Sequence, residues 1–513
     1  MGHHSPHLPS LPSLHFLTAT YTSPSSLVSS SCTAASAFQS CRIKPMSATA
    51  SFPSQLPPVN DGKTPHVMIV GAGLAGLLLA ILLDRAGIPY EVFERAKEIK
   101  PLGALMSLNT NILVALEQLG LLPEVEEISK PNSDLHVYND DLSKIGLFEV
   151  PNEKEVLGYD RLAFARPRLY QLLLSKVPPS KIHFSKRVMS MEQNKEGVMI
   201  RCSDGTTYHG DLLVGADGAY SGVRQGLYKL MQKDNLLPVE DTEELSKGFI
   251  CMVGTTDPLD PKEYPGLEDE RSCANVIIGK GSPYTWSAFT VPENRICWNV
   301  VVQLSSLAQS QEHKFRNSEW GPESNEEMIK EVEHFKTPFG HTMGELIAST
   351  PRDGISRVYL EDKLFETWHH GRTVLIGDAA HKLLPSAGQG AVTSMQDAVV
   401  LANCLYDLRS TSISDVTEAL KDFKEQRYPQ VKEQYEASKM NAQVLYGQTW
   451  YERLIRYGIF NYMPKSVQMK NVTKGTAIRP QATFLPFVPK RGSSPVIPQR
   501  PSRRLQAKAA ASV

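Results

Sequence analysis

Three glycines near residue 70 form a pattern that can bind a phosphate group. Gly71, Gly73 and Gly76 stand in the order G-x-G-x-x-G, after the apolar run 66–70 and before the apolar run 77–86. In such a turn the first glycine permits a tight bend, the second leaves room for a diphosphate, and the third lets a helix pack closely on a strand. Amide N–H groups at the start of that helix point at the phosphate. The pattern therefore predicts a dinucleotide site between a strand at 66–70 and a helix at 77–86.

An acid and an arginine extend this site. Glu94 ends a second predicted strand, 89–94, and follows Gly71 by 23 residues. An acid at about this distance can accept hydrogen bonds from an adenosine ribose. Arg95 comes next and could face the adenine side or a phosphate, or it could be a solvated surface charge. We predict cofactor contacts for both residues.

Two further motifs follow predicted strands later in the chain. Asp217-Gly-Ala-Tyr-Ser-Gly-Val-Arg224 comes after the apolar segment 211–216. Gly377-Asp378-Ala-Ala-His381 comes after the apolar segment 372–376, and Pro385, Gly388 and Gly390 lie just beyond it. A helix is predicted from Val392 to Leu408. An aspartate at the end of a strand and a glycine-rich turn that opens a helix are both typical of a cofactor-binding edge.

Taken together, the three motifs resemble those of the class A flavoprotein monooxygenases, the single-component FAD enzymes of the para-hydroxybenzoate and salicylate hydroxylase type. These enzymes carry the same three elements in the same order. The resemblance covers roughly residues 66–440, and the segment Arg479-Pro-Gln-Ala-Thr-Phe-Leu-Pro-Phe resembles fungal members most closely. It implies an α/β fold: a Rossmann-like FAD-binding domain of the glutathione-reductase type, interleaved with an antiparallel substrate domain and followed by C-terminal helices.

The resemblance also implies roles for individual residues. Arg166, in the pattern R-x-x-L-x-x-x-L, matches an arginine at the FAD, although an ordinary helix arginine is the alternative. Asp217 lies in a motif that the family uses for FAD and nicotinamide contacts, and Arg224 would hold phosphate or close an ion pair. His381 is interpreted as architectural. The cofactor-binding positions that the resemblance implies are Gly103, Ala104, Arg166, Asp217, Asp378, Pro385, Gly388 and Gly390.

The chemistry near the flavin also follows from the resemblance. Asp378 can accept from a ribityl hydroxyl or approach the diphosphate through water. Gly388 and Gly390 let the ring come close, and the positive end of the following helix stabilises the anionic edge of a reduced flavin.

The reaction that the resemblance implies needs FAD, NAD(P)H as a co-substrate, and O2. A C4a-hydroperoxyflavin would hydroxylate or epoxidise an apolar aromatic or isoprenoid molecule. A flavin-dependent oxidase or reductase without oxygen insertion is the alternative, and a flavoprotein that has lost catalysis is a third. Catalytic residues are not assigned, because no ionisable residue in 248–304 is an evident base. The aromatic and other apolar side chains of this segment either line the substrate pocket or belong to the hydrophobic core: Phe249, Met252, Trp286, Phe289 and Trp298.

The domains are predicted to be discontinuous. The FAD-binding domain comprises 61–130, 160–235 and 366–410, and the substrate domain comprises 131–159 and 236–365. The second of these contains short predicted strands at 248–256, 273–281, 284–291 and 296–304, which favour an antiparallel sheet. C-terminal helices follow at 411–465, and a basic tail at 466–513. Residues 1–60 are predicted to be a disordered leader or a transit peptide.

Charge is unevenly distributed along the 513 residues. Lys and Arg number 54 against 55 Asp and Glu, but residues 1–60 and 453–513 contain no acid. The segment 61–452 therefore has a net charge of −15, which argues against a nucleic-acid-binding body. The longest apolar run, 67–83, is too short to span a bilayer. The segment 457–464, with nearby basic residues, could instead contact a membrane surface, although packing on the FAD domain is the preferred alternative.

The seven cysteines stand at positions 32, 41, 202, 251, 273, 297 and 404. They are scattered and form no C-x-x-C pair, so neither a disulfide framework nor a metal site is predicted. This pattern indicates a reducing compartment. We expect a cytoplasmic enzyme, with organellar import through the N-terminal extension as the alternative. The oligomeric state is not predicted.

Overall fold

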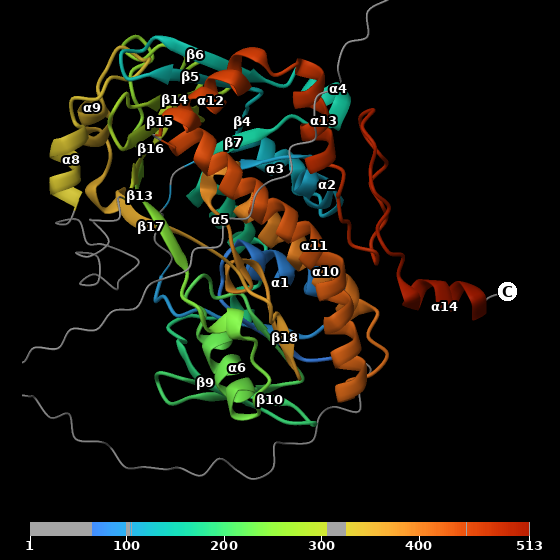
Figure 1. Cartoon of the computed structure of the whole chain (residues 1–513). Helices are drawn as coiled ribbons and strands as arrows, with labels where there is room; N and C mark the ends of the chain where they lie inside the picture. The colour runs from blue at the N-terminus through green and yellow to red at the C-terminus, as the bar shows by residue number, and fades with distance from the viewer. Residues whose placement is uncertain (1–63, 99–102, 104, 305–324, 448, 512–513) are drawn as a thin grey trace, which may run out of the picture. The chain divides into compact units, whose positions relative to one another are not determined.

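Two large sheets organise the part of the chain that the computed structural model describes, namely residues 64–98, 103, 105–304, 325–447 and 449–511 (Figure 1). All of these residues belong to one unit of the chain, residues 55–513. The predicted leader, 1–60, and Ala104 lie outside the described residues. One large sheet is mainly parallel and the other mainly antiparallel, which confirms the α/β fold and the antiparallel second sheet that the sequence predicts.

The parallel sheet collects strands from three distant segments of the chain. Its order is β18 (His369–His370), β19 (Thr373–Leu375), β12 (Leu212–Gly215), β1 (Val67–Val70), β2 (Tyr90–Phe93) and β8 (Ile182–His183). Only the pair β18–β19 is antiparallel. Strands β1, β12 and β19 are buried throughout, as expected for parallel strands covered on both faces. Their carboxyl ends meet at one edge, because Val70 pairs with Gly215 and Gly215 with Leu375.

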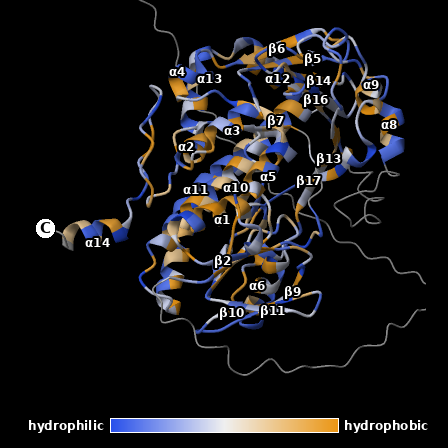
Figure 2. Ribbon diagram, turned by 180° about the vertical axis from the view of Figure 1, so that it is seen from behind, coloured by the Kyte–Doolittle hydropathy of each residue, from blue (hydrophilic) through white to orange (hydrophobic). Residues whose placement is uncertain are grey.

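Helices pack against this sheet and against one another. Helix α1 (Leu74–Ala86) packs on β1, β2 and α10 (Gly390–Tyr406). Its residues 74–83 are all buried, and its ribbon is largely hydrophobic in Figure 2. Gly87 ends α1 with a left-handed φ of 69°. Helix α10 also contacts α2 (Thr110–Gln118) and α11 (Ile413–Tyr446). Helix α5 (Arg166–Ser175) contacts α1, and α6 (Gly222–Lys233) contacts β12.

Two small sheets complete this half of the molecule. One contains β9 (Val188–Gln193), β10 (Val198–Cys202) and β11 (Thr207–Gly210). A hairpin turn at Asp204-Gly205 joins β10 to β11, and Gly205 has a φ of +83°. The other contains β3 (Leu105–Leu108), β7 (Leu162–Ala165) and β4 (Lys130–Pro131). Because β7 runs directly into α5, this second small sheet positions Arg166.

The antiparallel sheet has eight strands. Their order is β20 (His381–Lys382), β17 (Ser356–Leu364), β13 (Ser246–Thr255), β16 (Arg295–Gln303), β15 (Tyr284–Val291), β14 (Ala274–Ile278), β5 (Asp134–Asn139) and β6 (Lys144–Glu149). Only β14 and β5 run parallel. The strands predicted between 248 and 304 correspond to β13–β16. Strand β17 is not predicted from the sequence, because it contains the charged run 361–363, whose residues are buried by tertiary partners.

The two faces of this sheet differ. One face, here called the helix-covered face, packs under α8 (Glu326–Val332) and α9 (Met343–Ala348), which lie beside it in Figure 1. Its large side chains are Met252, Ile277, Trp286, Trp298 and Val300. The opposite face, here called the inner face, carries Cys251, Val301 and Leu360, which pack against Leu384 and Ala442.

The C-terminal part of the chain wraps around the body. After α11 come α12 (Trp450–Tyr462) and α13 (Lys465–Gly475), then an extended segment, 476–502, and α14 (Arg503–Ala511). Side-chain amides on α2 and α10 donate to backbone carbonyls of the extended segment, as in Gln118 to Ala482 (2.9 Å) and Asn403 to Gln481 (2.9 Å). Arg500 pairs with Asp422. Much of the predicted basic tail is therefore bound to acidic and amide side chains of the body.

Candidate functional site

Two glycines of the first motif are required by the packing of the protein itself. Gly71 has a φ of +106°, and a Cβ there would lie 2.4 Å from the carbonyl oxygen of Ala216. A Cβ on Gly76 would lie 2.1 Å from the carbonyl oxygen of Gly71. The obstructing atoms belong to the backbone, so they cannot swing aside as a flexible side chain would. These glycines make the tight turn and the close helix–strand contact that the motif predicts.

Gly73 differs from them because the space beside it is open. A Cβ on Gly73 would meet no atom nearer than 4.0 Å. Gly73 is also the N-cap residue of α1, and no side chain caps this helix. The free N–H groups of the first turn, and the positive end of the helix dipole, therefore face space that the protein does not fill. An anionic group such as a diphosphate fits this arrangement.

Glu94 links the second strand to the glycine turn. Its carboxylate accepts the Ala72 N–H at 2.9 Å and the Ala96 N–H at 2.8 Å. Tyr170 lies nearby, and burial, followed by the Glu94 charge, raises the pKa of its hydroxyl. A carboxylate has lone pairs for more than two donors, so Glu94 can also accept from a ribose hydroxyl. Arg95 is exposed and makes no hydrogen bond or salt bridge among the described residues.

Asp217 uses its side chain to cap a helix. Its carboxylate accepts from Ser221 Oγ at 2.5 Å and from the Gly222 N–H at 2.7 Å, at the start of α6. Burial raises the pKa of this carboxyl group, against the effect of these hydrogen bonds. The backbone of Asp217 lies against the glycine turn, since its Cα would be 2.8 Å from a Cβ on Gly71. The backbone of Asp217 therefore helps to shape the glycine turn, while its carboxylate is already hydrogen-bonded to the start of α6.

Arg224 joins the second motif to the third. Its guanidinium donates to the carbonyl oxygens of Ala379 (2.9 Å) and Ala219 (2.6 Å), and it lies 4.1 Å from the ring centroid of Phe365. The sequence left a phosphate contact or an ion pair open for this residue. The structure instead gives it backbone carbonyl partners in a buried position.

Asp378 stands among cations at the end of β19. Its carboxylate lies 2.5 Å from Lys382 Nζ. Burial favours the neutral acid, but the charges of Lys382, His381 and Arg166 outweigh it and hold the Asp378 pKa below its ordinary value. Gly103 packs on the same arginine, because a Cβ there would lie 2.8 Å from Arg166 Cδ. The structure therefore brings Gly103, Arg166 and Asp378 together, and their contact with FAD stays a prediction.

A fully buried charged network supports this edge from behind. His381 Nε2 lies 2.6 Å from Asp397 Oδ2, and Arg427 Nε donates to Asp397 Oδ1 at 2.8 Å. The Gly377 N–H also donates to Asp397, at 3.0 Å. The network thus fixes the Gly377–His381 turn to α10 and α11. It supports the architectural interpretation of His381. Asp397 and Arg427 were not singled out from the sequence, although an acid inside an otherwise apolar helix was an available signal.

The glycine turn after Pro385 leaves a second helix start open. Gly388 has a φ of +62°, and its N–H donates to the carbonyl oxygen of Pro385 at 2.8 Å. A Cβ on Gly388 would lie 3.5 Å from Ser107 Oγ of β3. Helix α10 begins at Gly390, where an added Cβ would meet nothing within 4 Å, and no side chain caps it. This helix start can therefore receive the edge of a flat ring.

The open starts of α1 and α10 lie close to each other. Gly377 packs between them, since a Cβ there would lie 2.9 Å from Ser394 Oγ on α10 and 3.7 Å from Ala75 Cβ on α1. We call this region the glycine cradle: Gly71, Gly73, Gly76, Gly377, Gly388 and Gly390. It combines two positive helix ends with the Asp378 carboxylate and with Arg166, which suits a dinucleotide that carries a flat ring.

Comparison with known proteins supports this interpretation. Residues 64–241 and 280–437 match the family described as FAD binding domain. Among curated relatives, the FAD-dependent monooxygenase ptmM of Penicillium ochrochloron is 32% identical over 391 residues, which cover 73% of this chain and 87% of that protein. The FAD-dependent monooxygenase paxM of Penicillium paxilli is 31% identical over 442 residues, covering 83% and 88%. The chain belongs to the FAD-dependent monooxygenases.

This membership confirms the family, the oxidoreductase class and the FAD cofactor that the sequence predicts. Solved structures agree on the fold. Klebsiella pneumoniae HpxO, complexed with FAD and uric acid, aligns with a TM-score of 0.66 at 22% identity, over 82% of this chain and 98% of HpxO. The 2,6-dihydroxypyridine-3-hydroxylase of Arthrobacter nicotinovorans aligns with a TM-score of 0.58 at 20% identity, over 75% and 94%. At these identities the likeness supports the fold alone.

In this FAD-dependent monooxygenase, the inner face of the antiparallel sheet lies beside the cradle. Val291 and Cys297 on this face form a cluster with Leu105 of β3 and Ala165, which precedes Arg166. Ser287 and Asn299 are cross-strand partners on the same face. Neither side chain has a hydrogen-bond partner among the described residues. Ser287 and Asn299 therefore form a polar patch on a mainly apolar surface.

The aromatic candidates from the sequence divide between the two faces. Met252, Trp286 and Trp298 belong to the helix-covered core. Phe249 lies on the inner face, where its ring centroid is 5.4 Å from that of Tyr446 on α11. Phe289 packs against Val276 and Ile278, which lie on the inner face according to the strand register. Only the two phenylalanines are therefore on the side of the cradle.

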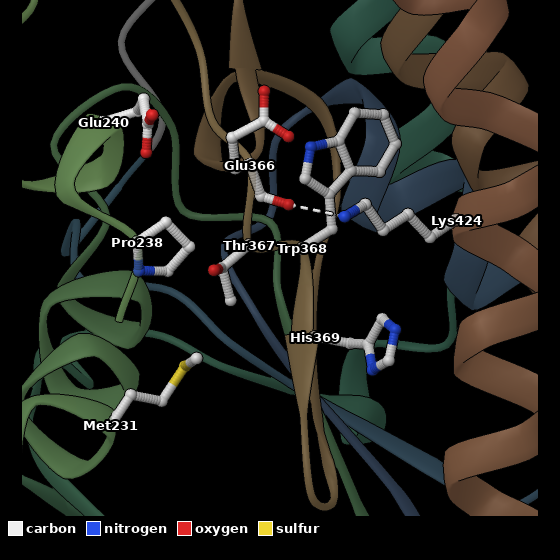
Figure 3. A pocket seen from close by; sticks show the side chains of 8 residues that line it. All are labelled: Met231, Pro238, Glu240, Glu366, Thr367, Trp368, His369 and Lys424. Carbon is white, nitrogen blue, oxygen red and sulfur yellow. Dashed lines mark hydrogen bonds between the residues drawn. The ribbon is translucent and has the colours of Figure 1, made fainter. Parts of the chain in front are cut away.

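A separate cavity of about 500 Å³ lies at the edge strand β18 (Figure 3). In this cavity Lys424 Nζ donates to the carbonyl oxygen of Glu366 at 2.6 Å. Burial, together with the charges of Lys424, His370 and Lys421, lowers the pKa of His369 to about 4. The cavity is lined by Met231, Pro238, Glu240, Glu366, Thr367, Trp368, His369 and Lys424. None of these residues is a predicted cofactor ligand, so this cavity is distinct from the cradle.

Proposed function

We propose that the glycine cradle holds FAD through the residues that the sequence singles out. The open start of α1 at Gly73 would receive the diphosphate, and Glu94 would accept from the adenosine ribose, with Arg95 beside it. Asp378 would accept from the ribityl chain, with Arg166 and Lys382 supplying positive charge near the diphosphate. The turn Gly388–Gly390 and the start of α10 would receive the flavin ring. Support comes from the space left at Gly73 and Gly390 and from the two uncapped helix starts.

We further propose that the enzyme uses NAD(P)H and O2 to hydroxylate or epoxidise an apolar aromatic or isoprenoid molecule. Bound FAD would supply the redox chemistry: the nicotinamide would give up a hydride equivalent, one oxygen atom of O2 would go to the substrate, and the other would leave as water. The observation that carries the substrate class is the inner face, which is mainly apolar and adjoins the cradle. An apolar surface also excludes water, and a monooxygenase must keep water away from its flavin.

The side chains on this face favour a substrate that needs no deprotonation. Burial raises the pKa of Cys251 and of Cys297 to about 12, so both thiols stay protonated at neutral pH. The cross-strand pairs of β15 and β16 from Thr285–Val301 to Phe289–Cys297 contain no acid, histidine or lysine. Ser287 and Asn299 would orient a hydroxyl or carbonyl group of the substrate. An alkene or an electron-rich ring suits such a pocket better than a phenol that must be ionised.

The deciding experiment follows the oxygen atom. Purified protein should be yellow, and an apolar aromatic or isoprenoid substrate should accelerate NAD(P)H oxidation. With 18O2, the product should gain one labelled oxygen, detected by mass spectrometry. Turnover without label in the product would instead identify an oxidase or reductase. A protein that binds FAD and turns over none of a broad substrate panel would indicate that catalysis has been lost.

The compartment remains a prediction. The five described cysteines are all unpaired, which supports a reducing environment such as the cytoplasm. Among the described residues, no helix is long and apolar enough to cross a membrane. Import through residues 1–60 would be tested by fusing them to a fluorescent protein and observing where the fusion accumulates.

A further inference from the structure

Helix α12 carries an apolar surface that the protein leaves exposed. Its large side chains are exposed by 73% at Trp450, 50% at Tyr451, 64% at Leu454, 52% at Ile455 and 73% at Tyr462. Their spacing of three, four and seven residues places them along one side of the helix. We call these five residues the α12 stripe. Helix α12 lies at the edge of the eight-stranded sheet, beside β6 (Figure 1).

The stripe is not the surface that attaches α12 to the body. On the opposite side of the helix, Phe460 packs on Gly146 of β6 so closely that a Cβ on that glycine would lie 2.5 Å from Phe460 Cβ. Arg456 is 3% exposed and donates to the carbonyl oxygen of Gly447. A capping box at Thr449 and Glu452 fixes the start of the helix. The packing of α12 is therefore complete without the stripe.

Exposed apolar side chains are concentrated on this helix. Of the sixteen large hydrophobic side chains that are exposed among the described residues, six lie on the thirteen residues of α12, namely the stripe and Tyr457. Single exposed apolar residues are ordinary on protein surfaces, but a cluster of this kind marks an interaction site. Four of these six residues are tryptophan or tyrosine, and both residue types prefer the boundary between water and lipid.

Charge identifies the partner. Helices α12 and α13 contain one acid, Glu452, against five basic residues, and Glu452 is engaged in the capping box. Arg453 and Lys470 are exposed and form no salt bridge among the described residues. A second copy of this chain would bring the same positive charges together, which disfavours self-association. An anionic lipid surface complements both the stripe and the charges.

The position of α12 also relates it to the proposed active site. Helix α11, which precedes α12, ends with Ala442 and Tyr446, and both pack on the inner face of the sheet with Cys251 and Val301. A lipid surface that touches α12 would therefore lie near the end of the helix that covers the inner face.

We propose that α12 docks the enzyme on anionic membranes. The helix lies in the interface, with Trp450, Leu454 and Ile455 inserted among the lipid headgroups and Arg453 and Lys470 on the lipid phosphates. This attachment is peripheral and reversible. It does not rest on the proposed reaction, and it would serve an apolar substrate that partitions into lipid.

The test uses the full chain with FAD bound, sedimented with phosphatidylcholine vesicles that contain or lack phosphatidylserine. Wild-type protein should sediment with the anionic vesicles, and the double variant Leu454→Ser/Ile455→Ser should bind about tenfold less tightly or worse. The matched control is Leu236→Ser/Val239→Ser, which removes two apolar residues that are 54% and 75% exposed elsewhere on the body. It should sediment as the wild type does. An unchanged flavin spectrum shows that each variant is folded.

Tryptophan fluorescence provides a second readout. Trp286, Trp298 and Trp368 are buried, and Trp320 lies outside the described residues, so the measurement uses a Trp320→Phe background. The emission of this protein should shift to the blue with anionic vesicles, and adding Trp450→Phe should remove the shift while the protein still binds. Several results would overturn the proposal: wild-type protein that stays in the supernatant, equal binding to neutral vesicles, or equal loss in the control. A wild-type dimer that the double variant converts to a monomer would assign the stripe to self-association instead. Because sedimentation is measured without turnover, none of these results bears on the monooxygenase reaction.

Discussion

The glycine cradle and the eight-stranded sheet carry function in opposite ways. In the cradle, function depends on side chains that are absent: Gly73 and Gly390 leave open space, and α1 and α10 begin without side-chain caps. On the sheet, function depends on which of two alternating sets of side chains faces the cradle. Trp298 belongs to the helix-covered core, whereas its neighbour Asn299 faces inward.

The difference shows how each region is constrained. A glycine motif is local, so one short segment determines both the turn and the free N–H groups of the following helix. A sheet face is assembled from residues two apart on several strands, and its orientation depends on pairing with distant strands. In the sheet, therefore, a residue that stabilises the fold and one that contacts the substrate can be neighbours in the sequence. In the cradle, a glycine serves packing where protein atoms lie beside it and serves binding where the space beside it is open.

The sharpest test of the sheet compares two adjacent residues. Trp298 is fully buried, and its Nε1 donates to Thr350 Oγ1 at 2.9 Å. We expect Trp298→Ala to lower the free energy of unfolding by about 3–5 kcal/mol. Asn299→Leu, on the inner face, should cost less than about 1 kcal/mol but alter the KM or the position of oxygen insertion. Denaturant unfolding and product analysis measure these effects. Equal destabilisation by both variants, or unchanged selectivity in Asn299→Leu, would break the division between the faces.

The cradle allows a matched pair of glycine variants. Gly76→Ala places a Cβ 2.1 Å from a backbone oxygen, so we expect it to destabilise even the FAD-free protein by about 1–3 kcal/mol or more. Gly73→Ala meets open space and has a φ of −74° that alanine accepts. It should leave the FAD-free protein as stable as wild type but weaken FAD binding by about tenfold, or about 1.4 kcal/mol. Thermal unfolding without FAD and flavin titration separate the two effects. Equal loss of stability would mean that Gly73 also serves packing.

The sequence predicts the cradle well because its signals are contiguous. The turns at Gly71 and Gly377 each follow a buried strand, so local pattern alone places them at strand ends, and Gly388 lies eleven residues beyond Gly377 in the same motif. It does not place their charged support. Asp397 and Arg427 come from α10 and α11, and only the packed structure shows that Asp397 pairs with both His381 and Arg427. Arg224 was read as a charge partner, whereas burial gives it carbonyl oxygens.

On the sheet, the sequence predicts strands but not faces. The strand 284–291 has the predicted bounds, yet nothing in its residues reveals which alternate set of side chains faces the glycine cradle. Size and aromaticity pointed equally to Trp286, Trp298, Phe249 and Phe289, and only the two phenylalanines lie on the inner face. Strand β17 was missed because the run 361–363 is charged. Its acids accept from Tyr220 and Tyr435, and Lys363 donates to backbone carbonyls, so tertiary partners make burial possible.

Asp378 tests whether charge as well as space defines the cradle. We expect Asp378→Ala to weaken FAD retention by about tenfold, because the ribityl chain loses an acceptor and Lys382 loses its partner. The ratio of flavin absorbance to protein absorbance after gel filtration measures retention. Asp204→Ala is the control, since Asp204 forms a comparable 2.5 Å pair with Lys186 away from the cradle. If flavin occupancy is the same in both variants, the role proposed for Asp378 is wrong.

The smallest expected effect comes from the cavity at β18, outside both regions. The His369 pKa is about 4 in the folded chain against 6.5 for an ordinary histidine. As pH falls from about 6.5 to about 4, the unfolded chain takes up a proton first, so this histidine stabilises the fold above that window and the contribution is lost within it. We expect a loss of about 1 kcal/mol after solvent screening. His369→Gln should remove this part of the slope of unfolding free energy against pH and leave FAD retention unchanged. A change in FAD retention would mean that the cavity and the cradle are coupled, which their separate linings do not indicate.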